Sequence, residues 1–146
     1  MNKESVIKEI TVKASASRAW KAITNNEEMK KWYFDLPEFK PEIGFEFQFT
    51  AGADTKKYVH LCKVTEVVEG RKITYSWRYE GHPGESYVTF ELFPEGESTR
   101  IRLTHSGLET FPADNPDFKR DNFVAGWTQI IGLQLREFLD LAVGKG

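Results

Sequence analysis

The chain has 146 residues, of which 40% are hydrophobic and 29% are charged, the composition of an ordinary globular protein. Its formal net charge of -2 gives no reason to expect nucleic acid or an anionic membrane as a partner. The single cysteine excludes an internal disulfide, and no apolar run approaches the roughly 18 residues of a membrane span. The charged start also lacks the apolar stretch of a signal peptide. We therefore expect a single domain, residues 1–146, in the cytoplasm.

The first part of the chain predicts a strand followed by two short helices. Residues 6–15 alternate between apolar and polar side chains, which is typical of a strand. Ser15 or Ser17 can cap the first helix, and Asn25 or Asn26 can cap the second. Two glutamates follow in the first turn of the second helix, where the helix dipole favours negative charge.

From residue 45 to residue 105 the apolar period changes to two, which predicts consecutive strands joined by short turns. Such strands favour an antiparallel meander. One strand changes parity between Leu61 and Val64, so we expect a β-bulge there. On the outer face we expect Arg100 and Arg102 to pair with Glu91 or Glu46. The inward side chains are expected to be Phe45, Phe47, Phe49, Ile73, Tyr75, Trp77, Tyr79, Val88, Phe90, Leu92, Ile101 and Leu103.

The last part of the chain predicts a long amphipathic helix, which Asp117 or Asp121 leads into. At 3.6 residues per turn, one face of it carries a mostly apolar stripe. Gln134 lies in the middle of that stripe, where an amide without partners would cost about 1–3 kcal/mol. It either bonds to a buried backbone group or the Tyr75 hydroxyl, or borders a cavity that water or a ligand fills. A mostly apolar pocket with few polar groups favours the cavity. The stripe consists of Phe123, Trp127, Ile130, Gln134, Phe138 and Leu141.

This order of elements predicts an α+β fold in which the final helix covers the apolar face of the sheet. A strongly twisted sheet cannot close perfectly on one helix. We therefore expect a space between them, lined by inward aromatic rings, since the chain has 11 Phe, 4 Trp and 5 Tyr.

Six stretches of the sequence, taken together, carry a family likeness: SASRAWKAITNNEEMKKWY, IGFEFQF, KVTEVVEGRKITYSW, YVTFEL, TRIRLTHSGL and GWTQIIGLQLREFL. They resemble the SRPBCC or START-like superfamily, and most closely the family named after the activator of the heat-shock-protein-90 ATPase. The resemblance implies a helix-grip (Bet v-like) fold, a curved antiparallel sheet around a long C-terminal helix, with two short helices after the first strand. It also implies either binding of a hydrophobic small molecule or contact with a chaperone. Because the eukaryotic activators carry a further N-terminal domain, we expect little chaperone stimulation from this domain.

Evidence for catalysis or metal binding is weak in the sequence. It lacks the G-x-S-x-G, H-E-x-x-H, P-loop and G-x-G-x-x-G motifs. His60 and Cys62 share one side of a strand, but no further metal ligands are evident, so we expect no metal and no cofactor. His105 ends a strand and should point inward. It is either bonded to the following loop or acts as an acid or base at a cavity mouth.

The most consistent hypothesis is a protein that binds a hydrophobic or aromatic small molecule between the sheet and the C-terminal helix. Two alternatives stay open: a chaperone-regulating interaction module, and a small cyclase-like or hydrolase-like enzyme that uses the same cavity. No catalytic residue is assigned, and the sequence does not indicate the oligomeric state. The candidate ligand-binding residues are Phe47, Tyr75, Trp77, Phe90, His105, Trp127, Ile131 and Gln134.

Overall fold

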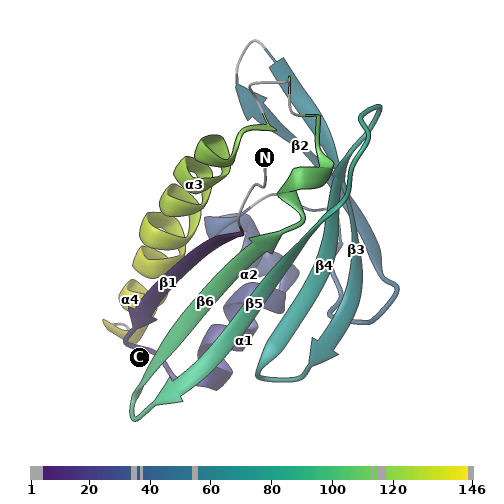
Figure 1. Cartoon of the computed structure of the whole chain (residues 1–146). Helices are drawn as coiled ribbons and strands as arrows, with labels where there is room; N and C mark the ends of the chain where they lie inside the picture. Colours follow the sequence, from purple (N-terminus) through teal and green to yellow (C-terminus); the bar gives the residue numbers. More distant parts are fainter. Residues whose placement is uncertain are drawn as a thin grey trace.

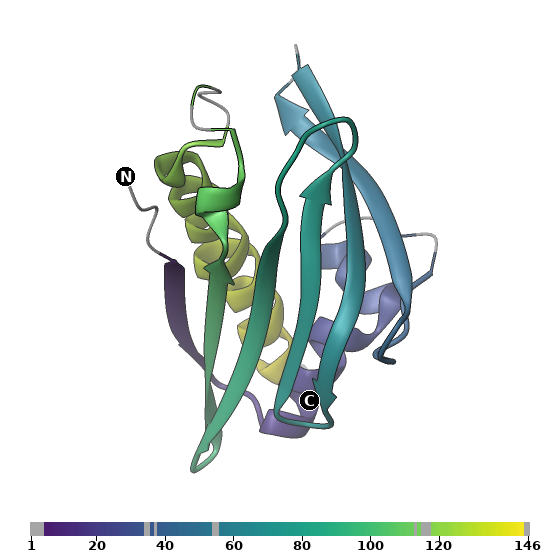
Figure 2. The ribbon, with the colours of Figure 1, turned by 45° about the vertical axis from the view of Figure 1, so that its right-hand side comes forward.

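Six antiparallel strands form one curved sheet in the computed structural model, which describes residues 5–33, 36, 38–53, 56–112, 114 and 118–144. Their order across the sheet is β1-β6-β5-β4-β3-β2, so β2 to β6 form a meander and β1 joins its far edge (Figure 1 and Figure 2). The predicted meander is therefore confirmed. The strands are β1 (Val6–Val12), β2 (Glu46–Ala53), β3 (Lys56–Val68), β4 (Lys72–Tyr79), β5 (Ser86–Glu95) and β6 (Ser98–Ser106).

The helices begin largely where the capping residues predict. The Ser15 hydroxyl accepts from the Arg18 amide at 3.1 Å, and the Asn25 side chain accepts from the Glu28 amide at 3.1 Å. Of the two residues predicted to begin the last helix, Asp121 lies in its first turn and Asp117 lies outside the described residues. The helices are α1 (Ala16–Thr24), α2 (Asn26–Trp32), the 3-10 turn η1 (Leu108–Thr110), and the continuous C-terminal helix made of α3 (Arg120–Gln129), the π-helical η3 (Ile130–Leu135) and α4 (Arg136–Gly144).

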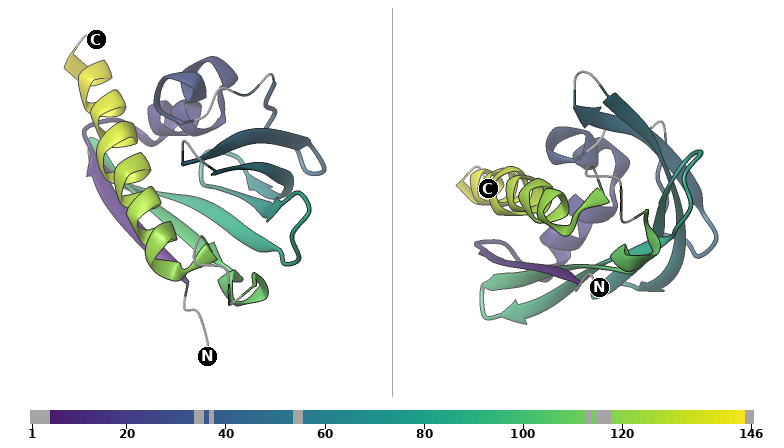
Figure 3. Two further views of the ribbon diagram at one scale, coloured as in Figure 1. Left: turned by 90° about the horizontal axis from the view of Figure 1, so that it is seen from above. Right: turned by 45° about the horizontal axis from the view of Figure 1, so that its top comes forward.

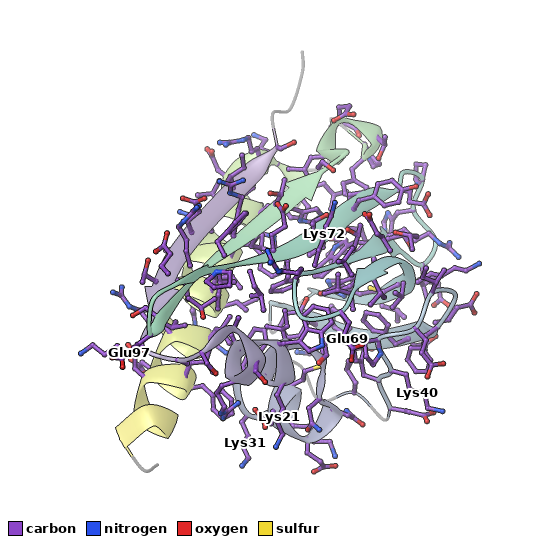
Figure 4. All side chains as sticks on the ribbon, turned by 90° about the horizontal axis from the view of Figure 1, so that it is seen from below. Lys21, Lys31, Lys40, Glu69, Lys72 and Glu97 are labelled. Atoms are coloured by element: carbon purple, nitrogen blue, oxygen red, sulfur yellow. The ribbon has the colours of Figure 1, made fainter. Side chains whose placement is uncertain are left out.

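Two helical layers share the concave face of the sheet. Seen from above, the C-terminal helix runs along β1, while α1 and α2 lie beside it (Figure 3). The Arg18 guanidinium of α1 contacts both of the other helices. It donates to Glu28 of α2 at 2.6 Å and lies 5.4 Å from the centre of the Phe138 ring of α4. Lys21 and Lys31 lie on the outward sides of α1 and α2 (Figure 4). The expected cover of the sheet by the final helix is therefore confirmed, and α1 and α2 share it.

β3 contains a bulge as predicted, but it lies after Val64, where the pairing register with β4 shifts between Val64 and Glu66. The change of parity expected between Leu61 and Val64 is wrong, because pairing with β4 is regular from His60 to Val64. Before the bulge His60, Cys62 and Val64 are buried on the concave side, and after it Val67 takes up that side. A bulge bends its strand and increases the local twist. We infer that this bend helps to turn β2 and β3 toward the helices.

The C-terminal helix departs from the predicted stripe because η3 is π-helical, with a wider turn than an α-helix. A regular period of 3.6 would place Ile130 and Gln134 toward the sheet. The wider turn buries Ile131 instead and leaves Ile130 and Gln134 half-buried at the margin. The Leu141 side chain lies outside the described side chains. The buried stripe recurs every four residues, at Phe123, Trp127, Ile131, Leu135 and Leu139. Within the described residues no helix is both long and apolar enough to cross a membrane.

The outer arginines pair with different glutamates from those predicted. Glu9 on β1 lies opposite Arg102 on β6 and accepts from its Nε at 2.5 Å. Arg100 donates to Glu9 at 3.0 Å and to Glu95 at 3.1 Å. The hydrogen bond from Arg102 lowers the pKa of the Glu9 carboxyl below its usual range. Glu9 could not be chosen from local sequence, because β1 and β6 are far apart in the chain.

Gly84 allows the loop before β5 to approach η1 closely. The Glu85 amide donates to the Thr110 hydroxyl at 2.8 Å, which fixes the start of β5. Gly84 has a φ of +105°, and a Cβ there would lie 2.5 Å from the Thr110 carbonyl oxygen. Gly81, in the same loop, also has a positive φ but has open space around it.

Gly84→Ala should therefore destabilise the protein by about 2–5 kcal/mol, the sum of a left-handed alanine and a steric overlap. Gly81→Ala should cost only about 1–2 kcal/mol, because it incurs the left-handed conformation alone. Urea unfolding of both variants measures the difference. Equal losses of stability would show that the approach to Thr110 does not constrain the fold.

Candidate functional site

Five aromatic side chains from five elements meet on the concave side of the sheet. We call Tyr33, Phe49, Trp77, Phe90 and Trp127 the inner aromatic cluster. The Tyr33 ring, at the end of α2, lies 6.3 Å from each of the Trp127, Phe90 and Phe49 rings, measured between centroids. Trp77 lies 5.6 Å from Phe49 and 5.5 Å from Trp127. The cluster thus joins α2, β2, β4, β5 and α3.

A chain of hydrogen bonds links the C-terminal helix to the sheet beside this cluster. The Trp127 Nε1–H donates to His105 Nδ1 at 3.0 Å, and His105 Nε2 lies 2.7 Å from the Ser86 hydroxyl. An indole N–H can only donate, so the proton of neutral His105 sits on Nε2, which donates to Ser86. The Ser86 hydroxyl then donates to the Trp77 carbonyl at 2.9 Å. We call this chain the Trp127–His105–Ser86 relay.

The hydrogen bonds of the relay engage the groups that acid–base catalysis would need. His105 and Ser86 are fully buried, and burial, with a smaller contribution from the charge of His60, lowers the pKa of His105 to about 3. The distance between the Ser86 hydroxyl and His105 Nε2 is that of a catalytic serine and its base. A catalytic base must accept the proton of the serine, however, whereas His105 Nε2 donates a proton to Ser86. The geometry favours a structural role for His105, with Ser86 and Trp127 as partners rather than the following loop.

His60 and Cys62 both face inward, side by side with the cluster. The His60 ring stacks on Phe49 at 4.5 Å, and its Nδ1 donates to the Tyr58 carbonyl at 3.0 Å. Burial lowers the pKa of His60 to about 4 and raises the pKa of the Cys62 thiol well above its usual value. Across the described part of the chain, no three His, Cys, Asp or Glu side chains are grouped to hold a metal ion.

Two tyrosine hydroxyls form the second polar contact inside the concave face. Tyr33 and Tyr75 are hydrogen-bonded through their hydroxyl groups, and burial raises the pKa of both well above the ordinary value. The Tyr75 ring is fixed on β4 by an edge contact with Phe47 at 5.0 Å. The Tyr33 residue as a whole is half-buried, while its hydroxyl is buried against that of Tyr75.

The partner of Gln134 is a backbone group. Its Nε2 donates to the Trp32 carbonyl at 2.8 Å. Trp32 is the last residue of α2, so this carbonyl has no partner within its own helix. The alternative partner predicted for Gln134, the Tyr75 hydroxyl, is bonded to Tyr33 instead. Gln134 therefore connects the C-terminal helix to the end of α2, and this bond supports the structural alternative over the cavity.

The structure brings most, but not all, of the predicted site residues together. Tyr75 contacts Phe47 and Phe90, while Ile131 is buried farther along the helix. The sequence does not single out Tyr33 or Ser86: Tyr33 lies at the end of the second short predicted helix, and Ser86 lies in a loop-like stretch without periodicity. Buried on the concave side are Phe47, Tyr75, Trp77, Phe90, His105, Trp127 and Ile131, with Gln134 half-buried at its margin.

A groove of about 490 Å³ lies on the opposite, outer face of β2, β3 and β4. Its outward side chains are mostly polar or charged, so it does not match the predicted apolar site. They are Glu46, Gln48, Leu61, Lys63, Ser76 and Arg78.

Comparison with known proteins identifies the fold and the family. Residues 13–140 match the family described as Activator of Hsp90 ATPase homolog 1-like protein. No curated protein matches the sequence.

Solved structures with this fold come from several sources. Protein MLL2253 from Mesorhizobium loti is 27% identical, with a TM-score of 0.76 over 93% of this chain and 96% of that one. The Aha1 dimer from Colwellia psychrerythraea is 21% identical, with a TM-score of 0.69 over 99% of this chain and 100% of that one. DynU16, from the dynemicin biosynthetic locus, is 19% identical, with a TM-score of 0.76 over 95% of this chain, which spans 48% of DynU16.

Stability should fall as the pH is lowered from 7 to 5. The unfolded chain binds protons at its histidines with a pKa of about 6.5, whereas buried His60 and His105 stay neutral in the native state. Each should therefore cost about 2 kcal/mol of stability at pH 5. Urea unfolding across this range measures the loss, and His60→Gln or His105→Gln should each remove about half of the slope. A stability independent of pH would contradict the burial of both rings.

Gln134→Leu should destabilise the protein by about 1–3 kcal/mol, because the Trp32 carbonyl loses its partner. Gln129→Leu, at an exposed position in the same helix, is the matched control and should change stability by less than about 0.5 kcal/mol. Thermal unfolding compares the two. If Gln134→Leu is neutral or stabilising, the amide does not support the end of α2.

Proposed function

We propose that this chain, which belongs to the Activator of Hsp90 ATPase homolog 1-like family, binds a hydrophobic, ring-containing small molecule on its concave side. The observation that carries the proposal is the inner aromatic cluster, where rings from the sheet and from two helices converge on one place. Ligand sites are mostly apolar and aromatic, with a few placed polar groups. Four of the five rings are buried and Tyr33 is half-buried, which supports access to the cluster from that side.

The hydrogen bonds around the cluster support an apolar ligand. The Trp77 Nε1–H donates to the Tyr79 hydroxyl at 2.9 Å, and the Trp127 Nε1–H donates to His105 at 3.0 Å. These donors already have partners, so a ligand gains little by offering acceptors to them. The ring faces and edges are what a ligand can contact, and these favour another ring system.

Binding without catalysis is supported by the Trp127–His105–Ser86 relay. An enzyme acting in this space would need a base with a free lone pair, and both nitrogens of His105 are engaged. The likeness to DynU16, from a biosynthetic locus, is consistent with a small-molecule role, although at 19% identity it conveys the fold only.

Chaperone regulation is the second candidate, favoured by the family description and by the full-length likeness to the Aha1 dimer from Colwellia psychrerythraea. At 21% identity that likeness conveys the fold and not a chaperone-binding surface. Titration into an Hsp90 ATPase assay tests the idea. We expect little stimulation, and saturable stimulation would move this candidate to first place.

An uncharged environment-sensitive dye, N-phenyl-1-naphthylamine, should bind the native protein saturably at about one site per chain. Phe49→Ala should weaken this binding by about fivefold, or about 1 kcal/mol, because it removes a ring of the cluster. Phe93→Ala is the matched control, since Phe93 lies on the outer face beneath Arg100 and should not affect the dye. Fluorescence titration gives both dissociation constants.

The dye experiment requires that the native state be intact, because partly unfolded proteins also bind apolar dyes. Cooperative unfolding of each variant under the titration conditions provides that control. Dye binding that appears only with partial unfolding, or that is equally sensitive to both substitutions, would contradict the proposed site.

A further inference from the structure

The Tyr33 side chain lies in the inner aromatic cluster as a bound molecule would. Its ring is nearly parallel to those of Trp32, at 4.9 Å and 24°, and of Trp127, at 6.3 Å and 25°. The Phe90 ring meets it edge-on at 6.3 Å, and Phe49 is tilted against it at 6.3 Å. Near-parallel and edge-on contacts at these distances are the favoured arrangements of aromatic pairs. The four rings therefore form a slot that fits one phenyl ring.

The inner end of this slot is polar. The Tyr75 hydroxyl bonds to that of Tyr33, and the rest of Tyr75 is packed among the rings, 2% exposed. A buried hydroxyl left without a partner is costly, so whatever fills the slot must bring a hydrogen-bonding group to this point. A ring with a hydroxyl at its far end meets both requirements, and that group is a phenol.

Tyr33 is also the member of the cluster best placed to leave. It is half-buried, whereas Phe49, Trp77, Phe90 and Trp127 are at most 7% exposed. It is the C-cap of α2: its amide still donates to the Met29 carbonyl at 2.7 Å, while its φ of -115° and ψ of -121° are no longer helical. A movement of this residue would leave the four rings of the slot on α2, β2, β5 and α3.

We propose that the ligand of this protein carries a phenolic ring that replaces the Tyr33 side chain in its slot and bonds to the Tyr75 hydroxyl. Tyr33 is then an exchangeable plug and Tyr75 the residue that selects for the aromatic hydroxyl. This inference rests on the proposed binding function and narrows it to one ligand class. The exchange replaces a ring by a ring and a hydroxyl by a hydroxyl, so neither the packing nor the Tyr75 hydrogen bond is lost.

The first experiment empties the slot. Tyr33→Ala should bind p-cresol, the side chain it has lost, at one site per chain by calorimetry, and p-cresol should raise its melting temperature. Adding Tyr75→Phe should reduce the preference for p-cresol over toluene at least fivefold, because the hydroxyl partner is gone. Tyr58→Ala is the matched control: Tyr58 is also half-buried but packs on Tyr79 and Phe118 and should show no such preference. A p-cresol preference that ignores Tyr75, or equal binding by the control, would overturn the proposal.

The second experiment uses variants that keep every ring. Tyr33→Phe should tighten the binding of 2-naphthol at least threefold, because the plug no longer holds the Tyr75 hydroxyl. Tyr75→Phe should reduce the preference for 2-naphthol over naphthalene at least fivefold. Unchanged affinity in the first variant, or unchanged preference in the second, would overturn the proposal even if Tyr33→Ala fails to fold.

The two experiments, together with the dye titration, distinguish a failure of this inference from a failure of the proposed binding function. If N-phenyl-1-naphthylamine binds the native protein but 2-naphthol and naphthalene bind equally well, the phenol class is wrong and hydrophobic binding stands. If neither the dye nor 2-naphthol binds, both the inference and the proposed function are wrong.

Discussion

The hydrogen bond from Trp127 to His105 is the interaction on which the arrangement of the concave face depends. It joins the C-terminal helix to β6 and decides which His105 nitrogen carries the proton. That choice decides the direction of the bond to Ser86, whose hydroxyl then donates to the Trp77 carbonyl across the pair of β4 and β5. Within the described residues no buried side-chain nitrogen or oxygen lacks a partner. A face built from Tyr and Trp rings can be buried only if each polar tip is met in this way.

Much of the fold could be predicted from the sequence, because strands, caps and the bulge are local. The sequence predicts the bulge in the right strand but before Val64 rather than after it, because Val59 and Leu61 are apolar although the buried face of this part of β3 carries His60, Cys62 and Val64. The partner of Arg102 could not be predicted, because Glu9 reaches it only through the pairing of β1 with β6. The inward rings of the candidate site follow from the same alternation. Their polar partners do not, since Ser86 and the Trp32 carbonyl are selected by how distant elements cross.

A shared fold does not decide between binding a small molecule and binding a chaperone, because function depends on the groups that a fold presents. Here the buried polar groups serve the structure, which leaves ring surfaces as the chemistry available to a partner. Tyr33 combines both roles, since it completes the packing and is the least buried of the five residues. The bond from Gln134 reaches Trp32, one residue before Tyr33, so the C-terminal helix also holds the backbone next to Tyr33 in place.

The π-helical segment η3 gives the C-terminal helix a property that its length does not reveal. Each residue added to or removed from an α-helix turns everything beyond it by about 100°. The part before η3 is held in rotation by Trp127 at His105, and the part after it by Leu139 in the core and by Asp140, which accepts from the Lys13 amide at 3.1 Å. The wider turns of η3 lie between these two parts. They allow each part to keep its own rotation about the helix axis, which a uniform α-helix would not allow. An insertion or deletion in this helix therefore rotates one part of it relative to the other. The π-helical turns of η3 are the place where the helix can accommodate such a rotation during evolution.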